Sequence, residues 1–213
     1  VPKGLTPNDY VSVVSVNELT NGRLAARGLC EHMVANDKTK AGFITFDSNF
    51  YATNQRDTSA QQLIDEDFPS IKIVAQTSFK KESEVFDKTL NLLAEYPEIE
   101  GIYTSWDGPA QQVIKALNTI DRLDIIVGTV DLDFSSALVI AEDGPIKCVS
   151  AQQPFEQGRA IGLAAAQSIL YKDVPSFIAI EPIMVNKENL LHSWRTVFKE
   201  EPPIELRERL SGK

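Results

Sequence analysis

Several side chains suited to hydrogen bonding or stacking follow apolar segments in this sequence. Trp106, Asp131 and Gln152 each come just after such a segment, and Arg56 lies early in a polar helical stretch. A carboxylate only accepts hydrogen bonds, a guanidinium offers five donors, and an amide does both. An indole ring adds a flat apolar wall. Together these groups predict a site for a small molecule that carries hydroxyl groups.

The clearest of these segments is GIYTSWDGPA, at residues 101–110. An apolar strand ends in Trp106 and Asp107, the chain turns at Gly-Pro, and a helix begins. The same order recurs at DIIVGTVD, which ends in Asp131, and at IKCVSAQQ, which contains Gln152. Ligands of open α/β sheets bind at the carboxyl ends of the strands. We therefore expect these side chains to converge on one rim.

Each of these residues also has a purely structural interpretation. Arg56 fits a solvated helix arginine, and Trp106 fits an ordinary core position. Asp107 and Asp131 each precede a predicted helix, where a carboxylate caps free backbone N–H groups. The sequence leaves these alternatives open.

Catalytic signatures are lacking in the sequence. It contains neither a glycine-rich phosphate loop nor a G-x-S-x-G nucleophile elbow. His32 and His192 fall in helical stretches without metal-ligand spacing. We therefore expect a binding protein with no catalytic residue, metal or cofactor. An α/β enzyme that uses Asp107 or Asp131 as a base is an alternative, which turnover of a bound sugar would reveal.

Apolar segments and amphipathic helical stretches alternate along the chain. Strands are expected at residues 10–16, 41–46, 71–75, 99–104, 124–130, 146–150 and 174–180. Helices are expected at residues 21–35, 52–67, 83–95, 109–118, 134–142, 155–171 and 187–199. This alternation predicts an α/β fold with a doubly wound parallel sheet. Five strands with four intervening helices lie within residues 41–150, and the segments 10–16, 155–171 and 174–180 are left over.

Composition narrows the class of protein. The 213 residues are 43% apolar and carry a formal net charge of −9. An acidic chain is a poor partner for nucleic acid, which requires clustered Lys and Arg. No apolar run reaches the length of a transmembrane helix. Cys30 and Cys148 are expected to be small buried thiols.

In order and spacing, these segments resemble the type I periplasmic sugar-binding proteins of ABC importers, of the ribose-binding kind. The similar pieces are VSVNELTNGRLAA, NQRDTSAQQL, YPEIEGIYTSWDGPAQQVIKAL, DIIVGTVD, IKCVSAQQPFEQG and VNKENLLHSW, which extend from about Tyr10 to Trp194. Effector domains of lac-repressor-type regulators share that fold.

The resemblance implies two lobes joined by three crossing strands. Residues 16–152 and 183–200 would form the C-terminal, ligand-binding lobe. Residues 1–15 and 153–182 would form part of the N-terminal lobe, and residues 201–213 a loosely held tail. Most of the N-terminal lobe is expected to lie upstream of this sequence, and the chain alone is expected to self-associate through its leftover segments.

The resemblance also assigns roles to particular residues. Arg56, Asp131 and Gln152 match ligand contacts of the family, and Trp106 stands where relatives often carry Asn, which implies stacking instead of a hydrogen bond. Asp107 joins this ligand-binding set. The hinge is expected at Ser15, Asn17, Gln153 and Pro182.

The implied function is solute binding for transport. The chain would bind a sugar or polyol in the interlobe cleft and deliver it to an ABC permease, in the periplasm or elsewhere outside the cytoplasm. The alternative is the effector-binding domain of a lac-repressor-type transcriptional regulator. An upstream signal peptide would favour the first function, and a helix-turn-helix the second.

Overall fold

The computed structural model describes residue 6 and residues 9–212, in which strands and helices alternate along most of the chain. The strands are β1 (Val13–Val16), β2 (Lys40–Phe46), β3 (Lys72–Phe79), β4 (Gly101–Thr104), β5 (Ile126–Val130), β6 (Ile146–Ala151), β7 (Phe177–Ile180) and β8 (Ile183–Asn186). The helices are α1 (Glu18–Ala35), α2 (Tyr51–Asp67), α3 (Val85–Glu95), α4 (Asp107–Thr119), α5 (Phe134–Ala141), α6 (Pro154–Ile169), α7 (Leu190–Phe198) and α8 (Ile204–Ser211), with a short 3₁₀ turn (Glu82–Glu84) before α3.

Most of the strands form one six-stranded sheet in the order β3-β2-β4-β5-β6-β8. Strands β2 to β6 pair in parallel, which confirms the α/β class and the five parallel strands expected from the sequence. The sixth strand, β8, was missed. It is four residues long, and it pairs antiparallel with β6, Ser150 lying opposite Met184. Its residues lie between the crossing at Pro182 and α7, and pairing with β6 makes them a strand.

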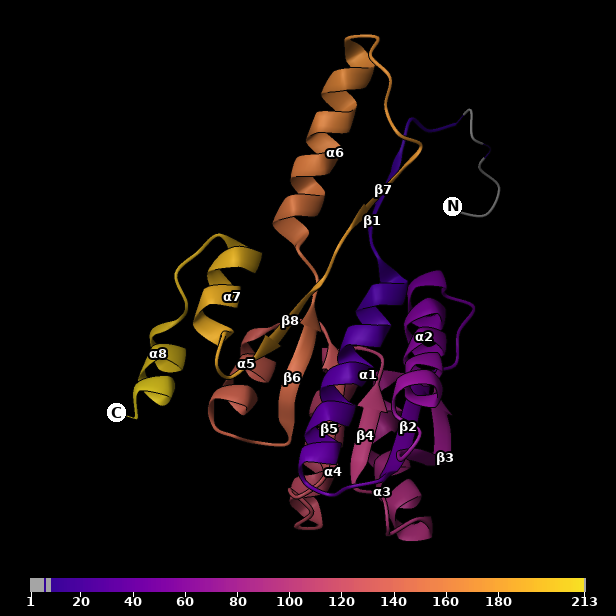
Figure 1. Ribbon diagram of the computed structural model, residues 1–213, viewed down its shortest axis with the longest axis vertical. Helices are drawn as coiled ribbons and strands as arrows, with labels where there is room; N and C mark the ends of the chain where they lie inside the picture. The colour runs from indigo at the N-terminus through magenta and orange to yellow at the C-terminus, as the bar shows by residue number, and fades with distance from the viewer. Residues whose placement is uncertain (1–5, 7–8, 213) are drawn as a thin grey trace.

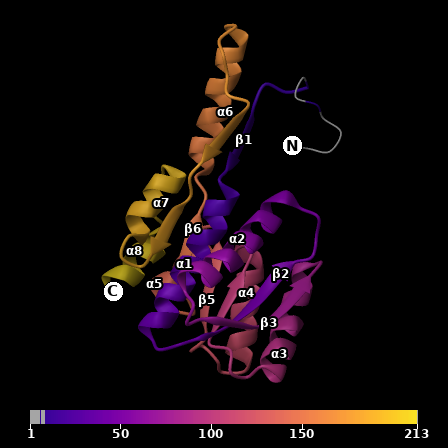
Figure 2. The same cartoon turned by 45° about the vertical axis from the view of Figure 1, so that its right-hand side comes forward.

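Helices cover both faces of this sheet (Figures 1 and 2). Helices α1 and α2 pack together on one face, where Leu29, Phe43 and Tyr103 lie in a fully buried core. Helices α3, α4 and α5 cover the other face, over a larger core that includes Ile102 and Val127. Burial on both faces explains why every residue of β4 and β5 is buried, with no alternation between buried and exposed positions.

A smaller unit projects from the end of the large sheet (Figure 1). Strands β1 and β7 form a two-stranded parallel sheet, and α6 packs against it. Apolar side chains remain exposed on this unit, among them Val11, Ile161 and Leu170. Two strands and one helix bury little apolar area. Self-association through these side chains stays a prediction.

Three chain segments connect the two sheets, and they bond to one another. The backbone N–H of Asn17, between β1 and α1, donates to the carbonyl of Ile180 at 2.9 Å. The side-chain amide of Asn17 donates to Glu181 Oε1 at 2.9 Å, and Gln153 Nε2 donates to the Glu181 carbonyl at 2.8 Å. The segments expected to cross between lobes therefore lie side by side. Of the predicted segment 1–15, residues 1–5, 7 and 8 lie outside the described residues.

The C-terminal segment differs from the expectation of a loosely held tail. Residues 204–211 form α8, which packs against α5, and Leu206 is fully buried in the larger core. The Arg209 guanidinium also pairs with Glu142 at 3.0 Å. Leu210, one turn after Leu206, also packs against this core. Two apolar positions in a Pro- and Glu-rich segment are too few to give a clear helical period.

Two further expectations concern the cysteines and membrane-spanning helices. Cys30 and Cys148 are both free and buried, as predicted. Within residues 6 and 9–212, none of the helices combines the length and the apolar character needed to cross a bilayer.

We expect Leu206→Ala to destabilise the protein by about 2–5 kcal/mol, the usual cost of emptying a buried leucine site. Denaturant unfolding of the chain measures this change. Ile204→Ala is the matched control, because Ile204 lies in the same helix but is 55% exposed. Its effect should stay within about 0.5 kcal/mol. Equal effects of the two substitutions would mean that α8 does not dock in solution.

Candidate functional site: a polar rim beside an aromatic pocket

Three of the predicted site residues lie just past the carboxyl ends of parallel strands. Trp106 follows β4 by two residues, Asp131 directly follows β5, and Gln152 directly follows β6. Strands β4, β5 and β6 are neighbours in the sheet, so their ends lie at the same rim. Arg56 reaches this rim from helix α2.

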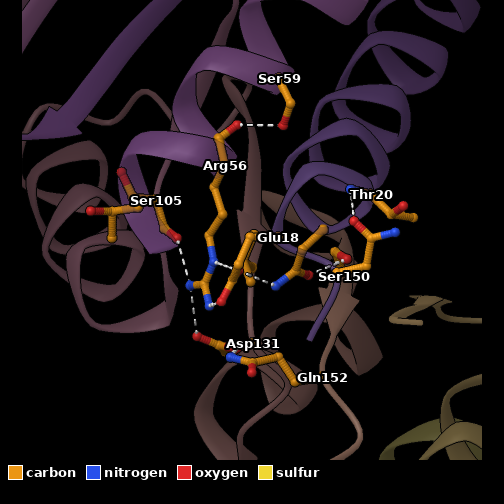
Figure 3. A network of polar contacts seen from close by, with 12 residues as sticks. Glu18, Thr20, Arg56, Ser59, Ser105, Asp131, Ser150 and Gln152 are labelled. Atoms are coloured by element: carbon orange, nitrogen blue, oxygen red, sulfur yellow. Dashed lines mark hydrogen bonds and ion pairs between the residues drawn. The ribbon is translucent and has the colours of Figure 1, made fainter. Parts of the chain in front are cut away.

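The guanidinium of Arg56 is the centre of the polar network (Figure 3). Only 6% of the residue is exposed. Its Nε donates to Glu18 Oε2 at 2.5 Å, and its Nη1 lies 3.5 Å from Asp131 Oδ2 and donates to the Ser105 carbonyl at 3.4 Å. Burial alone would lower the pKa of Arg56, but the bonds to Glu18 and the charge of Asp131 raise it. The alternative of a solvated helix arginine is therefore wrong.

Close packing of α1 against α2 brings Arg56 to this place. Gly22 in α1 faces the backbone of α2, and a Cβ there would collide with the Arg56 carbonyl oxygen and with Ser59 Oγ. That carbonyl accepts a hydrogen bond from Ser59 Oγ at 3.0 Å. The glycine thus permits the two helices to approach so closely that Glu18 and Arg56 meet across them.

Asp131 connects Arg56 to Gln152. Gln152 Nε2 donates to Asp131 Oδ1 at 2.6 Å, while Oδ2 faces Arg56. Asp131 has a φ of 74°, a conformation that Asp and Asn tolerate better than most residues. Burial raises its pKa, although Arg56 and Gln152 oppose that change. The helix-capping alternative is wrong for Asp131, because Asp133 caps α5 by accepting hydrogen bonds from the Ser135 and Ser136 N–H groups.

Trp106 is both a core residue and a pocket wall. Its ring packs edge-on against Phe46, with centroids 5.2 Å apart, and lies 5.3 Å from the ring of Phe79. It also borders a cavity of about 250 Å³. The residues that line this cavity are Phe46, Phe50, Ala52, Thr53, Arg56, Trp106 and Asp131. Trp106 therefore packs against the core and also faces the pocket, and its stacking on a ligand stays a prediction.

Asp107 is the first residue of α4 and does not cap it, since Trp106 occupies the cap position. Burial raises the pKa of Asp107 to about 6, and the negative charges of Asp131 and Asp133 add to this. Its carboxyl group therefore lies in the acidic part of the rim.

The sequence analysis missed two acids near this rim, the buried Glu18 and the partly buried Asp57. Glu18 begins α1 and pairs with Arg56. Asp57 accepts hydrogen bonds from Ser105 Oγ at 2.7 Å and from the Tyr103 hydroxyl at 3.3 Å. Burial raises the pKa of Asp57 to about 6, although these bonds oppose the rise. The only signal for Glu18 was its place after the helix-capping Asn17, and for Asp57 its adjacency to Arg56.

The arrangement can bind a polyhydroxylated molecule. It presents a carboxylate, an amide and a guanidinium beside an aromatic ring, within one connected network. Metal binding has no comparable support, since the described residues contain no cluster of three or more His, Cys, Asp or Glu side chains suited to a cation.

Comparison with known proteins gives a consistent result. The family model of the periplasmic binding protein domain matches residues 5–172. No curated protein matches the chain.

Solved structures share the fold. A periplasmic solute-binding protein of an ABC transporter from Actinobacillus succinogenes, with bound D-allose, is 24% identical with a TM-score of 0.76, over 84% of this chain and 63% of its own. A solute-binding protein from Bacillus halodurans with bound myo-inositol is 21% identical with a TM-score of 0.76, over 87% of this chain and 64% of its own. A periplasmic ribose ABC transporter protein from Conexibacter woesei is 21% identical with a TM-score of 0.77, over 86% of this chain and 62% of its own. This chain thus spans less than two thirds of their length.

We expect Asp57 to make the stability of the protein depend on pH. Its pKa rises from 3.8 to about 6 on folding, so the folded state binds the proton more tightly than the unfolded state. The stability from this group is complete below about pH 4 and is lost as pH rises through 6. Asp57→Asn should therefore gain stability relative to the wild type by up to about 1.4 kcal/mol per pH unit across this window.

Denaturant unfolding at several pH values between 4 and 7 measures this difference. Asp65→Asn is the matched control, because it removes a carboxylate from the exposed side of the same helix. A constant difference between Asp57→Asn and the wild type across the window would contradict the expectation.

Proposed function

The chain belongs to the periplasmic binding protein domain family, and from this premise we propose that it is the solute-binding component of an ABC importer, with a sugar or polyol as its ligand. The observation that carries the proposal is the chain of contacts from Arg56 through Asp131 to Gln152, beside the pocket wall of Trp106. These groups match the hydrogen-bonding needs and the apolar C–H face of a polyhydroxylated ring.

Each group has a distinct part in binding. Asp131 accepts hydrogen bonds from ligand hydroxyls, and Gln152 holds its other oxygen in place at 2.6 Å. Arg56 fixes Asp131 from the opposite side, with Nη1 at 3.5 Å from Oδ2. Trp106 stacks on the C–H face, and its contacts with Phe46 and Phe79 keep the ring in position. Asp107 adds an acceptor at the same rim.

We further propose a two-lobe division that follows the two sheets. Residues 16–152 and 183–200 form the ligand-binding lobe, and residues 1–15 and 153–182 belong to the opposite lobe. The hinge lies at Ser15, Asn17, Gln153 and Pro182. The hydrogen bonds of Asn17 and Gln153 to Glu181 support this assignment, because they tie the three crossings into one narrow connection.

The proposed partner is a membrane permease, and the proposed location is outside the cytoplasm. The support is the family itself and the similar structures, which are solute-binding proteins of ABC transporters. Sugars and polyols are the ligands that accompany those structures.

We expect Asp131→Asn in the full-length receptor to weaken sugar binding by roughly 1.5–3 kcal/mol, the range for hydrogen bonds to charged groups. Asn is chosen because it tolerates the positive φ of this position. A thermal-shift screen of sugars and polyols identifies the ligand, and calorimetry measures its affinity.

Asp47→Asn is the matched control for this measurement. Asp47 is an exposed carboxylate that pairs with Lys80 at 3.6 Å, outside the network of Arg56. It should leave the affinity unchanged. An unaltered affinity in Asp131→Asn would remove Asp131 from the site.

We expect the full-length receptor to close on its ligand by rotation at the three crossings. Rotation about a few backbone positions moves two lobes as rigid bodies and breaks neither sheet. Small-angle scattering with saturating ligand should show a smaller radius of gyration than without ligand. The same profile in both conditions would indicate a rigid site.

A further inference from the structure

Glu18 is a buried acid, and among residues 6 and 9–212 its only close cation is the proposed ligand-binding arginine. It is the first residue of α1, one position beyond the crossing at Asn17, and 7% of it is exposed. Its carboxylate faces Arg56 in helix α2 (Figure 3). Asn21 Nδ2, one turn further along α1, donates to Glu18 Oε2 at 3.4 Å and holds the carboxylate from the other side.

Glu18 occupies the fork of the guanidinium. Arg56 Nε donates to Oε2 at 2.5 Å, and Nη2 donates to Oε1 at 3.3 Å. This paired geometry is the one by which arginine recognises carboxylate and phosphate groups. An anionic ligand would therefore have to displace Glu18 to bind Arg56 in the same way. The remaining Nη1 faces the Ser105 carbonyl and Asp131.

The charge balance also disfavours an anion. Arg56 contributes one positive charge, and Glu18 and Asp131 contribute two negative charges at 2.5 Å and 3.5 Å from it. Asp107 and Asp133 lie close enough to Asp131 to add to the negative potential at this rim. Without the Glu18 carboxylate, the charges of Arg56 and Asp131 would balance. Arg56 Nε and Nη2, which now donate to Glu18, would become available to another acceptor.

Folding stability alone does not account for this pair. A buried ion pair is often no more stabilising than apolar side chains of similar volume, because both charges lose their hydration. Of the two partners, Arg56 lines the pocket together with Trp106 and Asp131. The charge of Glu18 therefore acts on what can enter through its hold on Arg56.

We propose that Glu18 determines charge specificity at this rim, where its carboxylate holds the guanidinium fork of Arg56 and excludes anionic ligands. This rests on the proposed function, and it narrows the ligand class to sugars and polyols without a carboxylate or phosphate group. Glu18 acts through Arg56 and is a positioning residue that need not touch the ligand.

Inorganic sulfate tests this role on the 213-residue chain without any sugar. Calorimetry with sodium sulfate, against sodium chloride at equal ionic strength, should detect no saturable sulfate binding in the wild type. Glu18→Gln keeps the size of the side chain but removes its charge, and it should bind sulfate at least tenfold more tightly. Glu18→Asn, whose shorter amide leaves both Arg56 donors free, should do the same and serves if the first variant does not fold.

Matched variants assign the effect to this pair. Glu66→Gln removes an exposed charge that pairs with Arg23 at 3.0 Å, and it should behave like the wild type. Combining Glu18→Gln with Arg56→Met should abolish the new sulfate binding. The proposal is overturned if a folded Glu18 variant binds sulfate no better than the wild type, or if the wild type already binds it as tightly as the variant.

The sulfate measurement is independent of the proposed transport function. If the chain bound no sugar, the Glu18 variants would still bind sulfate, because the negative charge that excludes it would be gone. Conversely, sugar binding could depend on Asp131 while the Glu18 variants bind no sulfate. That result would support the proposed function and would show that Glu18 does not determine charge specificity.

Discussion

The burial of one guanidinium constrains the arrangement of this rim. A charged group removed from water must find compensating charges and hydrogen-bond acceptors, or it destabilises the fold. Arg56 finds them in Glu18 from α1, the Ser105 carbonyl after β4 and Asp131 after β5. The three elements that carry these partners are far apart in the sequence, and each must keep its position relative to α2. This requirement fixes the arrangement of the site.

The same network reaches the crossings between the two sheets. Asn17 caps α1 through the Thr20 N–H and also bonds to Glu181, so the start of α1 is tied to the segment between β7 and β8. Glu18 follows Asn17 directly and holds Arg56. A rotation at the crossings would thus act on the first turn of α1, which carries the acid that faces Arg56. This continuity gives a physical route between movement of the lobes and the state of the rim.

The rim combines two kinds of contact, which differ in how strictly they depend on direction. The rings of Phe46, Phe79 and Trp106 pack against one another, and those of Phe46 and Trp106 line the pocket, where they offer area without strict direction. The polar chain from Arg56 to Gln152 is directional, and each of its members depends on the next. For the proposed sugar or polyol ligand, the first kind would supply contact area, and the second would distinguish hydroxyl arrangements and charges.

The sequence by itself determined the alternation of strands and helices and the five parallel strands, because period and turn residues are local properties. It also indicated the strand ends that carry Trp106, Asp131 and Gln152. The three segments that cross between the sheets were implied by the family resemblance and not by any local pattern. Only the tertiary structure decided that β8 is a strand, that Leu206 anchors α8, and that Asp133 caps α5 and leaves Asp131 free. Glu18 and Asp57 belong to the same class, since an acid in a helix reads as solvated until another element packs over it. Burial and pairing across α1, α2 and the rim are long-range contacts, and no local pattern encodes them.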